Sequence, residues 1–199
     1  MNGEADVAIC NPGAVLAMAL HGAPPFQPPV PVRAIMVLAQ FDRWGLVVAE
    51  STGLTSIADI RDQRYPLKVS PRGQRNHSVH LVTDQVLVAY GFSLSDIIEW
   101  GGELRYTPGL GTAPGRMDAV KRGELNALID EAFHSFAGRA LDNGMRILVE
   151  EPQLSQLEGM GLRRQFATRD EFPKLAADVT TIDFSGWPVF AARAPRTTW

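Results

Sequence analysis

The chain has 199 residues, of which 45% are hydrophobic and 21% are charged, and 22 acidic against 19 basic side chains give a net charge of −3. Such a chain forms one domain or two small lobes, and its core is large enough to need no disulfide or metal for stability. The single cysteine, Cys10, excludes an internal disulfide and a four-cysteine metal cage. Basic residues do not cluster, which argues against a general nucleic-acid binder. No run of about 18 apolar residues predicts a membrane span.

The chain opens with a short apolar run, Val7–Cys10, that predicts a buried strand over Asp6–Cys10. This run is not expected to be a signal peptide, because no basic region precedes it and Asn11-Pro12-Gly13 interrupts the apolar stretch. Five prolines in His21–Pro31 exclude a helix and predict an extended loop. The next strands are predicted at Arg33–Ala39, Gly45–Ala49 and Leu67–Ser70.

From Asn76 onward, helical patterns alternate with short strands. In Asn76–Tyr90 valines recur at helical spacing and Gly91 follows as a C-terminal cap. The alternation predicts an α/β fold with a mainly parallel sheet. The remaining predicted elements are strands at Ile97–Trp100, Ala127–Ile129, Arg146–Val149 and Pro188–Ala192, and helices from Pro114 to Gly123, over Phe133–Leu141 and from Pro152.

The strongest candidate site is the segment that leads into the helix beginning near Asn76. A helix N-terminus offers unpaired N–H groups and the positive end of a dipole, and here Arg72 and Arg75 lie beside it. The guanidinium of arginine can form a bidentate pair with a carboxylate, so the segment favours binding of a carboxylate. The segment is not a phosphate-binding P-loop, because the required glycine and Lys-Ser/Thr spacing is missing. Alternatively, Asn76 or Ser78 only caps the helix and the arginines are solvated.

Two further segments add candidate residues. The glycine-bearing loop Thr107–Pro114, with Arg116 in the following helical turn, predicts either the facing wall of a cleft or a plain turn. Asp130 and Glu131 stand where a strand ends and a helix begins, a position that holds ligands in open α/β sheets but where acids also stabilise the helix itself. As strand neighbours they are expected to point to opposite sides. The full set of candidate ligand-binding residues is Asn11, Ser70, Arg72, Arg75, Asn76, His77, Ser78, Thr112, Arg116, Asp130 and Glu131.

Metal-dependent and nucleophilic chemistry have weaker support in the sequence. His77 and His80 stand three residues apart on a predicted helix, and His134 follows Asp130 and Glu131, so a metal site of two histidines and one carboxylate is conceivable. No ligand-spacing motif connects these residues. A Gly-x-Ser-x-Gly nucleophile motif is absent, and Cys10 has no neighbour that would lower its pKa. We therefore expect no metal, no other cofactor and no catalytic residue.

Several passages occur in an order that resembles a known superfamily. Residues 4–9 followed by a helix, then residues 32–38 and 45–48, resemble the middle of the first lobe of type II periplasmic solute-binding proteins. Ser51–Arg64 resembles the passage into the second lobe, and Arg116–Ile129 resembles the returning helix and strand. Phe172-Pro173, residues 178–182 and residues 189–191 are most similar to the TAXI receptors of TRAP transporters. The chain is also similar to thiamine-precursor-type ABC substrate-binding proteins.

The resemblance implies a two-lobed type II periplasmic-binding-protein fold. Residues 1–49 and 132–199 would form lobe 1, and residues 50–131 lobe 2, with hinges near Ala49–Gly53 and Ala132–Phe136. The strands at residues 5–10 and 146–149 would then share a sheet. Family members begin with a signal peptide and two further strand–helix units, so lobe 1 is expected to be incomplete and the chain truncated. An uncovered sheet edge would favour a homodimer.

The implied function is that of a receptor that captures a small anionic solute, a carboxylate or an amino acid, for membrane transporter subunits in the periplasm. Family members carry a glycine-serine-glycine-threonine-like turn where this chain has Arg72–Ser78, which implies that a different or additional anionic group is bound there. Two alternatives stay open, both cytoplasmic. The effector-binding lobes of a LysR-like regulator would need a preceding helix-turn-helix, and an enzyme like the pyrimidine-precursor synthases would need a cysteine-rich iron motif.

Overall fold

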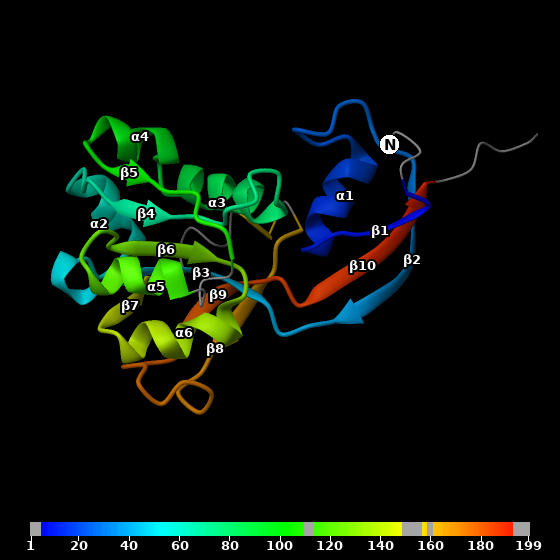
Figure 1. The fold of residues 1–199 in the computed structure, drawn as a ribbon. Coiled ribbons are helices and arrows are strands. Elements are labelled where there is room, and N and C mark those ends of the chain that lie inside the picture. The colour runs from blue at the N-terminus through cyan, green and yellow to red at the C-terminus, as the bar shows by residue number, and fades with distance from the viewer. Residues whose placement is uncertain (1–4, 110–113, 149–156, 159–160, 193–199) are drawn as a thin grey trace, which may run out of the picture. The chain divides into compact units, whose positions relative to one another are not determined.

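The computed structural model describes residues 5–109, 114–148, 157–158 and 161–192 (Figure 1). The chain divides into two compact units, one formed by residues up to Gln40 together with those from Phe184 onward, and the other by Phe41–Asp183. Both units contain helices and strands, which confirms the predicted α/β class. No helix within the described ranges is long and apolar enough to cross a membrane.

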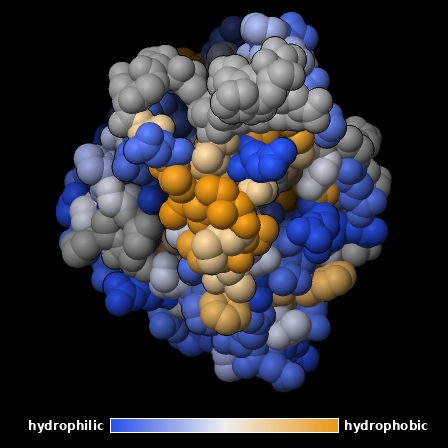
Figure 2. Space-filling view, turned by 90° about the vertical axis from the view of Figure 1, so that its right-hand side faces the viewer, coloured by the Kyte–Doolittle hydropathy of each residue, from blue (hydrophilic) through white to orange (hydrophobic). Residues whose placement is uncertain are grey.

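The first unit is a three-stranded antiparallel sheet with one helix. Its elements are β1 (Val7–Ile9), α1 (Gly13–His21), β2 (Val32–Ala39) and β10 (Gly186–Ala192), and β10 lies between β1 and β2. Helix α1 contacts β10. The sheet leaves large apolar side chains exposed, and apolar residues gather in one orange patch of the space-filling view (Figure 2). The exposed apolar side chains of the sheet include Val7, Ile9, Ile35, Met36 and Val37.

The second unit contains a seven-stranded mixed sheet in the order β5-β4-β6-β3-β9-β8, with β7 also paired to β3. Strand β4 is parallel to β5 and β6, whereas β3 is antiparallel to β6, β7 and β9. The expected mainly parallel sheet is therefore wrong. Strands β4 to β7 have a helix between each consecutive pair and share one direction, but β3 runs antiparallel to β6 and β7 in the middle of the sheet. The strands are β3 (Arg43–Ala49), β4 (Lys68–Ser70), β5 (Glu103–Leu104), β6 (Ala127–Asp130), β7 (Met145–Leu148), β8 (Arg164–Ala167) and β9 (Val179–Asp183).

Helices of the second unit confirm three of the predicted helices: α3, α5 and α6. The start of the helix expected from Pro152 lies outside the described residues. Gly91, the predicted cap of α3, has a φ of +82°. The helices are η1 (Glu50–Thr52), α2 (Ile57–Asp62), α3 (Ser78–Ala89), α4 (Leu94–Glu99), α5 (Pro114–Lys121) and α6 (Phe133–Asp142).

The strand predicted at Ile97–Trp100 is wrong, because this segment belongs to α4. The Ser93 hydroxyl accepts the Asp96 N–H at 3.2 Å, and the Asp96 carboxylate accepts the Ser93 N–H at 2.7 Å. This capping box starts a helix just before the apolar residues, so local capping overrides their strand-like pattern. The other seven predicted strands are confirmed within two residues. The expected burial of the first strand is wrong, because all three residues of β1 are exposed.

The lobe organisation differs in one respect from the sequence expectation. Strands β1 and β7 lie in different sheets, so the expectation that residues 5–10 and 146–149 share a sheet is wrong. Strand β1 pairs with β10, whereas β7 pairs with β3. The lobe boundaries at residues 49 and 131 stay a prediction.

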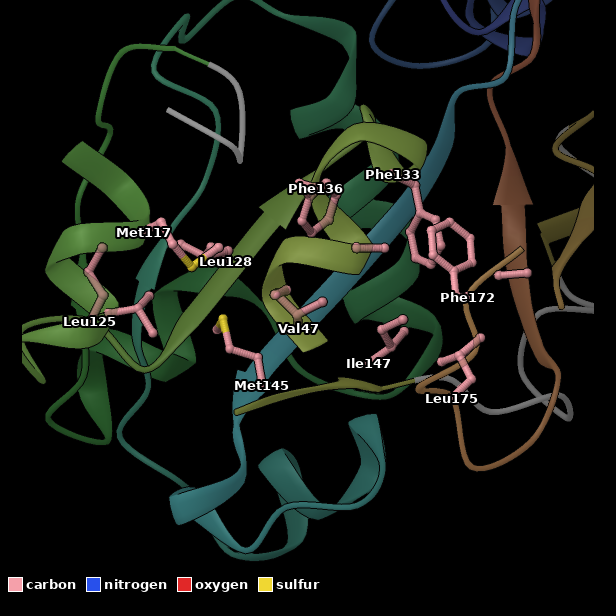
Figure 3. Packing of buried hydrophobic residues seen from close by; sticks show 14 of the residues in the cluster. Val47, Met117, Leu125, Leu128, Phe133, Phe136, Met145, Ile147, Phe172 and Leu175 are labelled. Atoms are coloured by element: carbon pink, nitrogen blue, oxygen red, sulfur yellow. The ribbon is translucent and has the colours of Figure 1, made fainter. Parts of the chain in front are cut away.

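One hydrophobic core cluster of the second unit lies where α5 and α6 cover β3, β6 and β7. Phe133 meets Phe136 and Phe172 edge to face, with ring centroids 5.8 and 5.5 Å apart, over the apolar side chains of the strands (Figure 3). Gly45 of β3 makes this packing possible. A Cβ atom at Gly45 would lie 2.5 Å from Cδ2 of Phe133, closer than packed atoms tolerate.

We expect Gly45→Ala to lower the free energy of unfolding by about 1–3 kcal/mol, because the added methyl group overpacks the core against Phe133. Urea denaturation measures the change. Gly138→Ala in α6 is the matched control, since no atom lies within 4 Å of a Cβ there. Alanine should stabilise that helix by about 0.5–1 kcal/mol. An unchanged midpoint for Gly45→Ala would contradict the packing argument.

Candidate anion-binding site

The candidate site lies at the carboxyl ends of two parallel strands. Val69 and Ser70 of β4 pair with Ala127 and Leu128 of β6, so the residues that follow both strands meet at one edge of the sheet. Ligands bind at this edge in open α/β sheets. Arg72 follows β4, and Asp130 and Glu131 lie at the end of β6.

A buried ion pair forms the floor of this site. The Arg116 guanidinium lies 2.5 Å from Asp130 Oδ2, and both side chains are fully buried. The guanidinium also donates to Ser70 Oγ at 3.1 Å, to Ser70 O at 2.6 Å and to Ile129 O at 2.9 Å. Burial lowers the pKa of Arg116, and the Asp130 carboxylate opposes that shift. These bonds tie α5 to the ends of β4 and β6.

Arg72 contacts both neighbouring acids above this floor. Its Nη1 donates to Glu131 Oε1 and lies 3.4 Å from Asp130 Oδ1. The expectation that the two acids point to opposite sides is therefore wrong. Strand β6 ends at Asp130, so Glu131 no longer follows the strand alternation, and the Asp130 Oδ1 atom turns back to accept the Ala132 N–H at 3.0 Å.

His77 adds a neutral ring to the cluster. As the N-cap of α3, its Nδ1 accepts the Val79 N–H at 3.3 Å, which leaves the ring proton of neutral His77 on Nε2, 3.5 Å from Glu131 Oε1. Burial, with repulsion from Arg72 and His80, lowers the pKa of His77 to about 4. The ring is therefore neutral at pH 7 and faces Glu131 as a weak donor.

Glu131 is the least satisfied acid of the cluster. Its residue is 3% exposed, and Oε2 has no hydrogen-bond partner among the residues that the structure describes. Burial and the neighbouring Asp130 charge raise the pKa of Glu131 to about 7, and the Arg72 charge offsets only part of that shift. Burial and Asp130 also raise the pKa of the half-buried Asp42. Glu131 is thus partly protonated at neutral pH.

The structure brings most of the predicted residues to this edge of the sheet, in different roles. Ser70 is fully buried and supports Arg116. Arg75 is exposed and stacks over the Tyr106 ring at 4.0 Å, and Asn76 is exposed beside it. Ser78 is the first residue of α3. Thr112 lies outside the described residues, and Asn11 belongs to the first unit, before α1.

The second predicted loop does pack against the first. Arg72 and Thr107 form a parallel bridge, and a Cβ at Gly73 would lie 2.7 Å from Pro108 backbone atoms. Glycine is therefore needed at position 73 for the two loops to approach. The carbonyl of Gly109 also lies 3.4 Å from Arg116 Nη1.

Sequence reasoning missed Asp42 and Tyr106. Asp42 precedes β3 and interacts electrostatically with Asp130, Arg72 and Glu131, because the antiparallel pairing of Gly45 with Asp130 brings these segments together. Tyr106 meets Arg75 through the pairing of β4 with β5. Both contacts depend on long-range strand pairing, for which the local sequence holds no signal.

Comparisons with known proteins show similarity of structure at low sequence identity. No protein-family model matches the chain, and no curated protein matches its sequence. A solved structure of a protein from Bordetella bronchiseptica RB50 is 16% identical with a TM-score of 0.48, over 96% of this chain and 48% of that one. A periplasmic transporter structure is 12% identical with a TM-score of 0.44, over 94% and 57%. A TctC solute-binding protein from Polaromonas is 12% identical with a TM-score of 0.44, over 96% and 58%. The chain spans about half to three-fifths of the length of these structures.

Replacing Arg116 with alanine should cost about 3–5 kcal/mol of stability, because Asp130 is left buried without its partner. Urea denaturation tests this expectation. Arg122→Ala is the control, since Arg122 and Glu124 form an exposed pair that solvent screens. Combining Arg116→Met with Asp130→Asn should recover much of the loss, because no unpaired charge stays buried. A cost for Arg116→Ala as small as that of the control would contradict the buried pair.

The pH dependence of stability should change in Glu131→Gln. The folded-state pKa of Glu131, about 7, lies above its ordinary value of 4.5. The contribution of Glu131 to the free energy of unfolding is therefore full below pH 4.5 and is lost as the pH rises through 7, a loss of about 1–3 kcal/mol. His77 acts in the opposite direction, so the parent and the variant must be compared at each pH. Between pH 4.5 and 7.5, the free energy of unfolding of Glu131→Gln, measured by urea denaturation, should rise relative to that of the parent. If the two proteins show the same dependence of this free energy on pH, the burial of Glu131 is contradicted.

Proposed function

We propose that this chain is the binding part of a solute receptor and that Arg72 binds the carboxylate of a small ligand. The observation that carries the proposal is that the Arg72 side chain is mostly buried yet partly exposed. Its side chain is 17% exposed, whereas the Arg116 side chain is fully buried. Arg72 therefore combines a low-dielectric surrounding, which strengthens an ion pair, with access for a ligand.

The present partners of Arg72 favour exchange for an external anion. Asp130 is already paired with Arg116 at 2.5 Å and lies 3.4 Å from Arg72. Glu131, the nearer partner, has a pKa of about 7, so it holds its charge weakly at neutral pH. A ligand carboxylate with an ordinary pKa near 4 stays ionised under the same conditions and competes well for the guanidinium. The first N–H groups of the 12-residue helix α3 lie next to this position.

The finer parts of the proposal rest on the sequence resemblance. We propose that the chain, like a TAXI receptor, binds its solute in the periplasm without bond chemistry and delivers it to membrane transporter subunits. The anionic solute is a carboxylate or an amino acid, and nucleic acid is not a partner. A homodimer would cover the exposed apolar sheet of the first unit.

A thermal-shift screen of carboxylates and amino acids tests the proposal. A ligand that binds only the folded protein raises its melting temperature with concentration. At least one carboxylate should do so, and the amide of the same compound should not. If no carboxylate shifts the melting temperature, the proposed function is wrong.

Arg72 and Arg75 should respond differently to substitution. Arg72→Ala should weaken binding of the carboxylate found in the screen by about 2–5 kcal/mol, because a partly buried charge pair is lost. Arg75→Ala should cost less than about 1 kcal/mol, since Arg75 is exposed and stacked on Tyr106. Isothermal titration calorimetry measures both variants. Equal effects of the two substitutions would place the ligand elsewhere.

A further inference from the structure

We infer that anion binding at Arg72 is coupled to the uptake of one proton by Glu131, so that the site binds its ligand more tightly at low pH than at high pH. This inference rests on the proposed function and specifies how the site is regulated. It starts from the fact that Arg72 has carboxylate partners within the protein. An incoming anion must share the guanidinium with them or displace them.

The geometry singles out Glu131 as the acid that responds. Its Oε1 faces Arg72 and His77, while Oε2 is buried and has no partner in the described part of the chain. Asp130, in contrast, keeps the Arg116 guanidinium and the Ala132 N–H whatever happens at Arg72. When Arg72 turns to a ligand, Glu131 alone is left as a buried carboxylate without compensation. Protonation removes that charge, and the new O–H can donate to the ligand or to Asp130.

The charges around Glu131 support this assignment. Arg72 is the cation that faces its carboxyl group, and Arg116 acts from α5 but is saturated by Asp130 and backbone carbonyls. Arg43 donates only its backbone N–H to the Glu131 carbonyl, because its guanidinium is held by Glu171 at 2.8 and 2.9 Å. The charged and titratable groups that interact with Glu131 are Arg72, His77, Asp42, Asp130 and Arg116, and an added anion makes this set more negative.

Two other groups are poorer proton acceptors. His77 uses Nδ1 to accept the Val79 N–H at the start of α3, so its protonation would break the helix cap and add a charge beside Arg72. Asp42 is half-buried and next to Asp130, but it is more exposed than Glu131 and its charge is better solvated. Well above pH 7, where Glu131 is ionised in the free protein, one proton moves from solvent to its carboxylate for each anion bound, and no covalent bond to the ligand forms.

The experiment uses acetate, which stays fully ionised from pH 6 to 9 and therefore contributes no proton change of its own. NMR shift titrations of the full chain give the dissociation constant of acetate at each pH. In the parent it should rise by up to tenfold per pH unit above pH 7. In Glu131→Gln it should not change with pH. Asp42→Asn is the matched control and should keep the slope of the parent.

The outcomes separate this inference from the proposed function. A pH-independent dissociation constant in the parent, or the parent's slope in Glu131→Gln, overturns the coupling but leaves carboxylate binding intact. Loss of the slope only in Asp42→Asn assigns the proton to Asp42 and also overturns it. No acetate binding at any pH overturns both. If Glu131→Gln does not fold, calorimetry of the parent at pH 8 in two buffers of different ionisation enthalpy decides, because close to one proton per acetate supports the coupling and none refutes it.

Discussion

The guanidinium of Arg116 lies in the interior of the second unit, where it holds a carboxylate and three other oxygens of β4 and β6. A buried charge is tolerated only when it is paired and its donors are used, and here Asp130 and the backbone meet both conditions. The edge of the sheet on which Arg72 and Glu131 stand is shaped by these bonds, because they fix the ends of the two strands and the first turns of α5 together. Removing either charge would disturb the ion pair and both strand ends at once.

This arrangement gives two adjacent acids different properties. Asp130 is stabilised by a dedicated cation and a backbone N–H, so its charge is part of the fold. Glu131 follows one residue later, shares Arg72 with Asp130, and has a buried oxygen for which the described residues offer no partner. Neighbouring positions in the sequence thus differ in how firmly they hold a charge. The difference arises from which cation each carboxylate reaches, and it makes Glu131 the adjustable member of the pair.

Local patterns were enough to predict seven strands and three helices. They also pointed to the segment around Arg72 as a candidate site. Valines at helical spacing and Gly91 predict α3, and apolar runs predict β3 and β6, because burial and capping act over a few residues. The strand predicted at Ile97–Trp100 failed because the capping box of Ser93 and Asp96 outweighs two isoleucines. The reversed direction of β3, the position of Asp42 and the stacking of Arg75 on Tyr106 depend on pairing between distant segments, which no local pattern encodes.

Three arginines near this edge show why exposure alone does not define an anion site. Arg116 is fully buried and its guanidinium is paired within the protein, so it is not available to a ligand. Arg75 stands in water, where an ion pair with a solvated carboxylate gains little. The Arg72 side chain contacts buried groups and is 17% exposed. The proposed ligand can therefore reach its guanidinium, and the ion pair between them would be screened less than at the surface. The carboxyl group that would compete with the ligand for Arg72 is that of Glu131, which is readily protonated. The proposed exchangeable anion site at Arg72 rests on this combination: a cation that is partly exposed, low-dielectric surroundings, and an internal partner, Glu131, whose carboxyl group is readily protonated.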